Sequence, residues 1–205
     1  MTRNEILSQV RKLLSDEEAP YLWRDEELDF YYELAVRELC RETGIFTKTV
    51  TFFTVNGQYL YDYPSSFTEI LLVKTGDRIL NKVPFSFIDT RMGIKGQVMW
   101  YCLDYLPTKI LLHYTPEEDG QIIKVTGSAV PESDEIDSAV PEKYSHFLIE
   151  GVLANAFTKS DSETVSPFAE KYKLLWLSRI EQVKRDLERQ YYNPLNRTII
   201  HRGLL

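Results

Sequence analysis

Residues 47–64, TKTVTFFTVNGQYLYDYP, decide the fold, because here the sequence changes from a helical to a strand-like pattern. The first eight of these residues are β-branched or aromatic apart from Lys48, which is typical of a strand. Asn56-Gly57 is a strong two-residue turn signal, since both residues tolerate a positive φ. We therefore expect a hairpin in which residues 58–63 pair with the strand before the turn.

On the N-terminal side of this stretch, residues 3–43 have helical spacing. Thr2-x-x-Glu5 is a capping box, in which each side chain can satisfy a free backbone N–H at a helix start. A second helix start follows at Asp25, and Gly44 is a natural C-cap. The expected apolar stripes of these two helices are Ile6, Val10, Leu13 and Leu14, then Leu28, Tyr31, Tyr32, Ala35 and Leu39.

On the C-terminal side, short strand-like runs continue to about residue 130. Residues 84–90 fit one short helical turn between them. This pattern predicts a small antiparallel sandwich or barrel. The further expected strands are Phe67–Lys74, Ile79–Val83, Val98–Leu103, Lys109–Tyr114 and Ile122–Thr126.

Helical spacing returns after residues 115–140, an acidic and polar connection that we expect to hold the last strand and then a mobile loop. Pro141 is well placed at a first helical position. Its helix has a stripe at Tyr144, Leu148, Val152 and Ala156. A longer helix, about 37 Å, is expected from Pro167 to Tyr191. Its seam is Phe168, Tyr172, Leu175, Trp176, Ile180, Val183, Leu187 and Tyr191.

Together these patterns predict an α+β protein. Two N-terminal and two C-terminal helices, residues 1–45 and 138–191, form a helical bundle. An inserted small antiparallel β-sandwich or barrel occupies residues 46–137. An extended C-terminal tail covers residues 192–205.

The tail is apolar and basic on a chain whose formal charge is −7, and it contains no acidic residue. A disordered terminus is normally polar. We interpret the tail as a segment that docks on a partner, with folding back on its own domain as the alternative. The candidate partner-binding residues are Asn193, Pro194, Leu195, Arg197, Ile199, Ile200, Arg202, Leu204 and Leu205.

Catalytic signatures are missing from the sequence. His113, His146 and His201 fall in a strand, a helix and the tail, without a second ligand at metal spacing. We expect each to be a surface or half-buried histidine. No glycine-rich phosphate loop or nucleophile elbow occurs. The sequence therefore predicts no enzyme, no catalytic or metal-binding residues and no cofactor.

Charge, cysteine content and hydropathy indicate where the protein works. An acidic chain is unsuited to ordinary nucleic-acid binding, yet its charge is compatible with letting DNA pass without sticking. Cys40 and Cys102 are interpreted as two buried thiols in a reducing compartment. No apolar run approaches the roughly 20 residues that span a bilayer, and the N-terminus opens into an amphipathic helix. We expect a cytosolic protein or part of a particle assembled there.

A family resemblance adds to this reading. The motif Y-x-x-P-x-x-F-x-x-I-x-x-V is followed by three further matching stretches in a fixed order. Within the helix–β–helix plan of residues 3–191, they resemble the tail-tubular or head-to-tail adaptor proteins of tailed bacteriophages. The stretches are YDYPSSFTEILLV (61–73), GQVMWY (96–101), Leu106-Pro107 with ILLHYTP (110–116), and VPEKYSHFLIEGVLANAF (140–157).

The resemblance implies a structural virion protein without catalysis, located in the neck or tail and in the host cytoplasm during assembly. It implies a homo-oligomeric ring, commonly of about twelve copies, that joins the portal protein to tail or nozzle proteins. Helices would face the portal, the β part would face the tail, and the C-terminal segment would reach the portal. DNA would pass through the lumen without sequence-specific binding, and no membrane is involved.

Two other functions fit the sequence less well. A host-directed regulatory or receptor-binding module would use the β part for recognition. A tail-associated hydrolase acting on cell wall or nucleic acid would need a catalytic carboxylate, and nothing in the sequence nominates one.

Overall fold

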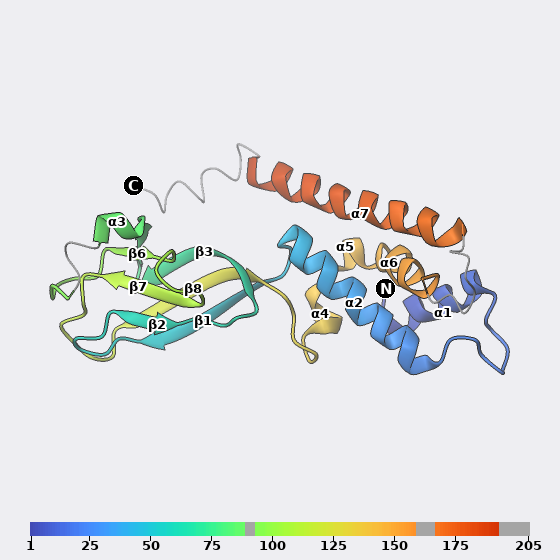
Figure 1. Cartoon of the computed structure of the whole chain (residues 1–205), viewed down its shortest axis with the longest axis horizontal. Helices are drawn as coiled ribbons and strands as arrows, with labels where there is room; N and C mark the ends of the chain where they lie inside the picture. The colour runs from blue at the N-terminus through green and yellow to red at the C-terminus, as the bar shows by residue number, and fades with distance from the viewer. Residues whose placement is uncertain (89–92, 159–166, 193–205) are drawn as a thin grey trace. The chain divides into compact units, whose positions relative to one another are not determined.

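The computed structural model describes residues 1–88, 93–158 and 167–192 (Figure 1). They form two compact units. The helical unit contains Met1–Phe46 and the described residues from Val130 onward, and the β unit lies within Thr47–Ala129. The α+β class predicted from the sequence is confirmed. The nine tail residues nominated for partner binding lie outside the described residues.

The first two helices begin and end where their local signals predict. Helix α1 is Arg3–Leu14, and its capping box is complete. The backbone N–H of Glu5 donates to Thr2 Oγ1 over 3.3 Å, and the N–H of Thr2 donates to Glu5 Oε2 over 2.8 Å. Helix α2 is Asp25–Thr43, and Gly44 caps it with a φ of 67°.

The C-terminal helical region is more segmented than predicted. It contains α4 (Ile136–Ala139), α5 (Glu142–Ser145), α6 (Leu148–Ala156) and α7 (Pro167–Tyr192). The expected loop before Pro141 is wrong in part, because α4 buries Ile136 in the helical core. The expected third helix is interrupted between α5 and α6. There the Ser145 hydroxyl donates to the Glu142 carbonyl, a bond that competes with the helical ladder.

Helix α6 is the centre of the helical unit and contacts α1, α2 and α7. It is apolar on almost every side, as expected for a helix surrounded by other helices. Gly151 lets neighbouring helices pack tightly against α6. A Cβ atom at this position would lie 2.8 Å from Ala35 Cβ and 3.1 Å from the ring of Trp176. The predicted stripe Tyr144, Leu148, Val152 and Ala156 is buried.

The β unit consists of two four-stranded sheets, with strand orders β1-β8-β3-β4 and β2-β7-β6-β5. All pairs are antiparallel except β5 with β6, so the second sheet is mixed. The expected short helical turn is α3 (Phe85–Ile88). The strands are β1 (Thr47–Phe53), β2 (Leu60–Asp62), β3 (Phe67–Thr75), β4 (Arg78–Ile79), β5 (Asn81–Lys82), β6 (Trp100–Cys102), β7 (Lys109–His113) and β8 (Ile122–Ala129).

The predicted hairpin around Asn56-Gly57 is wrong, although the turn itself forms. The N–H of Gln58 donates to the Val55 carbonyl over 2.9 Å, and Gly57 has a φ of 81°. However, β1 pairs with β8 and β2 pairs with β7. The turn therefore carries the chain from one sheet to the other, and the rings of Phe52 and Tyr61 stack with centroids 4.7 Å apart.

Candidate assembly surfaces

The two cysteines are buried free thiols, as predicted. Cys40 lies in the helical core and Cys102 in the second sheet. Burial raises the pKa of Cys40 to about 12 and also raises the pKa of Cys102. Because the thiolate is the reactive form, both side chains are chemically quiet in the folded protein.

This burial predicts slow thiol chemistry. In native protein at pH 8 we expect neither Cys40 nor Cys102 to be modified by a water-soluble disulfide reagent within minutes. Both should react once the chain is unfolded in denaturant, giving two thiols per chain by absorbance. Rapid modification of Cys40 in native protein would show that the helical core opens easily.

The expectation that each histidine is at the surface or half-buried is wrong for His113, which is fully buried. Its side chain is 1% exposed, inside the aromatic cluster of Phe87, Trp100 and Tyr114. The cause is its position at the end of β7, a strand that is buried on nearly every residue. His146 is exposed as expected, and His201 lies outside the described residues.

The described residues contain neither a candidate metal site nor a candidate membrane-spanning helix. Within residues 1–88, 93–158 and 167–192, no group of three or more His, Cys, Asp or Glu side chains could hold a metal ion. None of the helices in these ranges has the length and apolar character needed to cross a bilayer.

Arg11 organises the loop between α1 and α2. Its guanidinium donates to Asp16 Oδ2 over 2.8 Å and to the Trp23 carbonyl over 3.2 Å, and also pairs with Asp25. Asp16, only 6% exposed, in turn accepts the backbone N–H of Leu22 over 2.7 Å. A buried ion pair with further hydrogen bonds fixes a unique geometry, so this loop is rigidly held at both ends.

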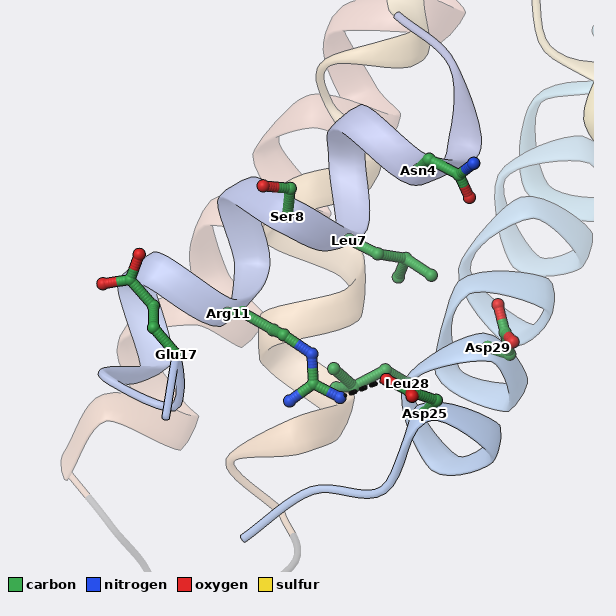
Figure 2. Close-up of a pocket in the computed structure, with 8 residues that line it drawn as sticks. All are labelled: Asn4, Leu7, Ser8, Arg11, Glu17, Asp25, Leu28 and Asp29. Carbon is green, nitrogen blue, oxygen red and sulfur yellow. Dashed lines mark hydrogen bonds and ion pairs between the residues drawn. The ribbon is translucent and has the colours of Figure 1, made fainter. Parts of the chain in front are cut away.

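A groove next to this loop is lined by residues of α1, of the loop and of α2 (Figure 2). In the close-up, Arg11 reaches from α1 across to Asp25 at the start of α2. Leu7 and Leu28 provide the apolar part of the lining. The remaining lining residues are polar or charged: Asn4, Ser8, Glu17 and Asp29.

The tip of the same loop exposes apolar side chains. Tyr21 is 45% exposed and Leu22 is 60% exposed, and Leu13 at the end of α1 is 51% exposed. The guanidinium of Arg11 lies 4.2 Å from the centroid of the Tyr21 ring, which holds that ring in place. The sequence did not indicate this surface, because the tip follows a run of acidic residues. Such runs are usual in solvated loops.

Helix α7 has two different faces. Trp176, Ile180 and Val183 of the predicted seam are buried against the helical core. The seam prediction is wrong for Phe168 and Leu175, which are exposed. Opposite the buried residues runs an outward stripe at helical spacing: Lys171, Leu174, Leu175, Ser178, Gln182, Arg185 and Arg189.

The β unit carries an exposed apolar patch of its own. Phe53 and Ile122 are direct partners across β1 and β8, so their side chains share one face of the sheet. They are exposed by 61% and 43%, and the neighbouring Val55 is also exposed. Exposed apolar groups that cluster in this way are typical of protein–protein contacts.

Charge is distributed unevenly between the units. The helical segments, residues 1–46 and 130–192, contain 23 acidic and 14 basic residues. Residues 47–129 contain eight of each kind. The whole excess of negative charge therefore belongs to the helical segments, whereas the tail after residue 192 is basic.

Comparison with known proteins assigns the chain to a family. A family model described as SU10 adaptor protein matches residues 1–198, which include both the helical unit and the β unit. The chain belongs to the SU10 adaptor protein family. The expected resemblance to phage head-to-tail adaptors is confirmed at the level of the family. The comparison with curated proteins gave no match.

Family membership sets the broad role of this adaptor. The SU10 adaptor family is one of phage structural adaptors, so the chain is a component of the virion that contacts other virion proteins. This role is structural in kind. It agrees with a molecule whose distinctive surfaces are the α1–α2 loop tip, the α7 stripe and the β patch.

Proposed function

We propose that this adaptor forms a ring of about twelve copies that joins the portal to the tail and lines the channel through which DNA leaves the head. The observation that supports this best is the family match over residues 1–198, because it extends through both units. A ring subunit needs separate surfaces for two different neighbours along the particle axis. The helical and β units provide two bodies of different chemistry.

In this proposal the helical unit faces the portal and the β unit faces the tail. The Phe53–Ile122 patch supports the second assignment, since it supplies an apolar contact surface outside the β core. The acidic excess of the helical segments supports a DNA channel, because like charge keeps the phosphate backbone from adhering.

The C-terminal tail supplies the attachment to the portal in this proposal. Residues 193–205 begin directly after α7 and combine Leu195, Ile199 and Ile200 with Arg197 and Arg202. Apolar and basic side chains on a short segment can add contact area and charge pairing when the segment is ordered on a partner. The remaining proposed contact residues are Asn193, Pro194, Leu204 and Leu205.

Deleting residues 193–205 is expected to weaken binding to purified portal rings by tenfold or more, measured by biolayer interferometry. The circular dichroism spectrum and the thermal midpoint should remain those of the full chain, because the deletion begins after the last residue of α7. A paired Phe53→Ser and Ile122→Ser variant, altered only in the β patch, should bind portal normally. Portal affinity that is unchanged by the deletion would remove the tail from this role.

The wider proposal is tested by imaging. Electron micrographs of full-length adaptor mixed with portal should show ring-shaped density stacked on one face of the portal. Particles that stay separate at micromolar concentrations, together with a virion neck that lacks this chain, would refute the adaptor ring.

A further inference from the structure

The loop between α1 and α2 is held by hydrogen bonds at both ends and exposes apolar side chains to solvent. Asp16 is buried and fixes the backbone of Leu22, yet the Leu22 side chain is 60% exposed. A loop that is already ordered loses little further entropy when it binds, so its apolar tip is preorganised for contact. Residues 15–23 also contain three acids and no base, and Glu17 and Glu18 are exposed beside the tip.

The outward stripe of α7 is complementary to this tip. Leu174 and Leu175 are 61% and 38% exposed, and Lys171 and Arg185 are exposed on the same stripe. The whole stripe, from Lys171 to Arg189, contains no acidic residue. Glu170, Glu181, Asp186 and Glu188 all fall on its two flanks, as the helical spacing of 100° per residue requires.

The loop tip cannot be covered by the stripe of its own chain. The stripe lies opposite Trp176 and Val183, which pack into the same core as α1 and α2, so it faces away from that core. The two surfaces therefore lie on different sides of one helical unit. Two complementary surfaces of this kind give a heterologous contact, which repeats from copy to copy and can close a ring.

We propose that the α1–α2 loop of one copy docks on the outward α7 stripe of a second copy. Leu22 and Tyr21 pack on Leu174 and Leu175, while Glu17 and Glu18 face the basic residues of the stripe. This inference rests on the proposed ring and names the pair of surfaces that hold it together.

A charge-swap cycle in the full-length chain tests the contact. Loop reversal (Glu17→Lys with Glu18→Lys) and stripe reversal (Lys171→Glu with Arg185→Glu) should each weaken self-association by tenfold or more, because like charges then oppose one another. The four changes combined should restore assembly to within about threefold of the original chain, since the pairs are re-formed with opposite sign. Sedimentation velocity and mass photometry give the distribution of species.

Controls separate this inference from the proposed function. Lys82→Glu with Lys124→Glu reverses two exposed charges in the β unit and should leave assembly unchanged. All reversed positions are exposed, so thermal midpoints should agree among the variants. If the original chain forms rings that neither single reversal affects, or that the combined variant fails to restore, this contact is wrong while the ring stands. A chain that stays monomeric even on portal refutes both.

Discussion

Replacing Trp176 with alanine is expected to destabilise the helical unit by about 3–5 kcal/mol, the range for removing a large buried aromatic side chain. Trp176 is 3% exposed, and its Nε1 donates to Glu38 Oε2 over 2.7 Å. Its ring also packs on Gly151 of α6, where an added Cβ atom would lie 3.1 Å from it. The substitution therefore opens a cavity and removes the indole donor from Glu38 in one step.

Urea unfolding followed by far-UV circular dichroism measures this effect. Phe30→Ala is the matched control, because Phe30 is an aromatic residue on α2 of the same unit and is 55% exposed. It should cost about 1 kcal/mol or less. A Trp176→Ala variant that loses no more stability than the control would show that α7 contributes little to the helical core.

Replacing Gly127 with alanine is expected to destabilise the β unit by about 2–4 kcal/mol. A Cβ atom at Gly127 would lie 2.4 Å from the carbonyl oxygen of Glu69 and 2.8 Å from the ring of Phe67. The register of β3 against β8 shifts between these two residues, so the strand already bends at this point. Because the nearest obstacle is backbone, the clash can be relieved only by moving β3 and β8 apart.

Hydrogen exchange localises this second effect. Peptides from β3 and β8 should lose protection in Gly127→Ala, while peptides from α6 and α7 keep theirs, since the two units are separate compact bodies. Thr51→Val on the exposed face of β1 serves as control and should change stability by about 0.5 kcal/mol or less. Uniform protection in both variants would contradict the close β3–β8 contact.

Local signals made the helix ends predictable. Thr2 with Glu5 acts through hydrogen bonds and Gly44 through backbone conformation, each within a few residues of one helix end, so the sequence contains all the information needed. The same holds for the start of α7 at Pro167. The interruption between α5 and α6 was missed, because it depends on the side-chain bond of one serine rather than on a glycine or proline.

Strand partners were less predictable, because pairing is decided by contacts far apart in the chain. The Asn56-Gly57 signal describes a turn and not the two strands beside it. In the structure Phe52 of β1 and Tyr61 of β2 stack between the two sheets and do not pair within one hairpin. Similarly, the acidic residues around Ile136 suggested a loop, whereas the short helix α4 buries Ile136 and Ala139 in the helical core.

The candidate surfaces were predicted only in part. Composition alone nominates the tail, since it is apolar and basic on an acidic chain, and its role in contacts stays a prediction. The loop tip and the α7 stripe could be identified only from the structure, because the structure shows which apolar residues remain exposed. Leu174 and Leu175 occupy adjacent positions, and one of them was assigned to the buried seam although both are exposed.

The path of the chain into and out of the β unit has a mechanical consequence. The chain enters through β1 and leaves through β8, and these two strands are direct neighbours with Thr47 opposite Ser128. Tension between the two units would therefore be divided between two parallel covalent tethers. It would pass from β8 into β3 as shear, loading all of their paired residues together rather than peeling them apart one at a time. A β unit connected in this way resists a pulling force by shear across its two central strands, β8 and β3.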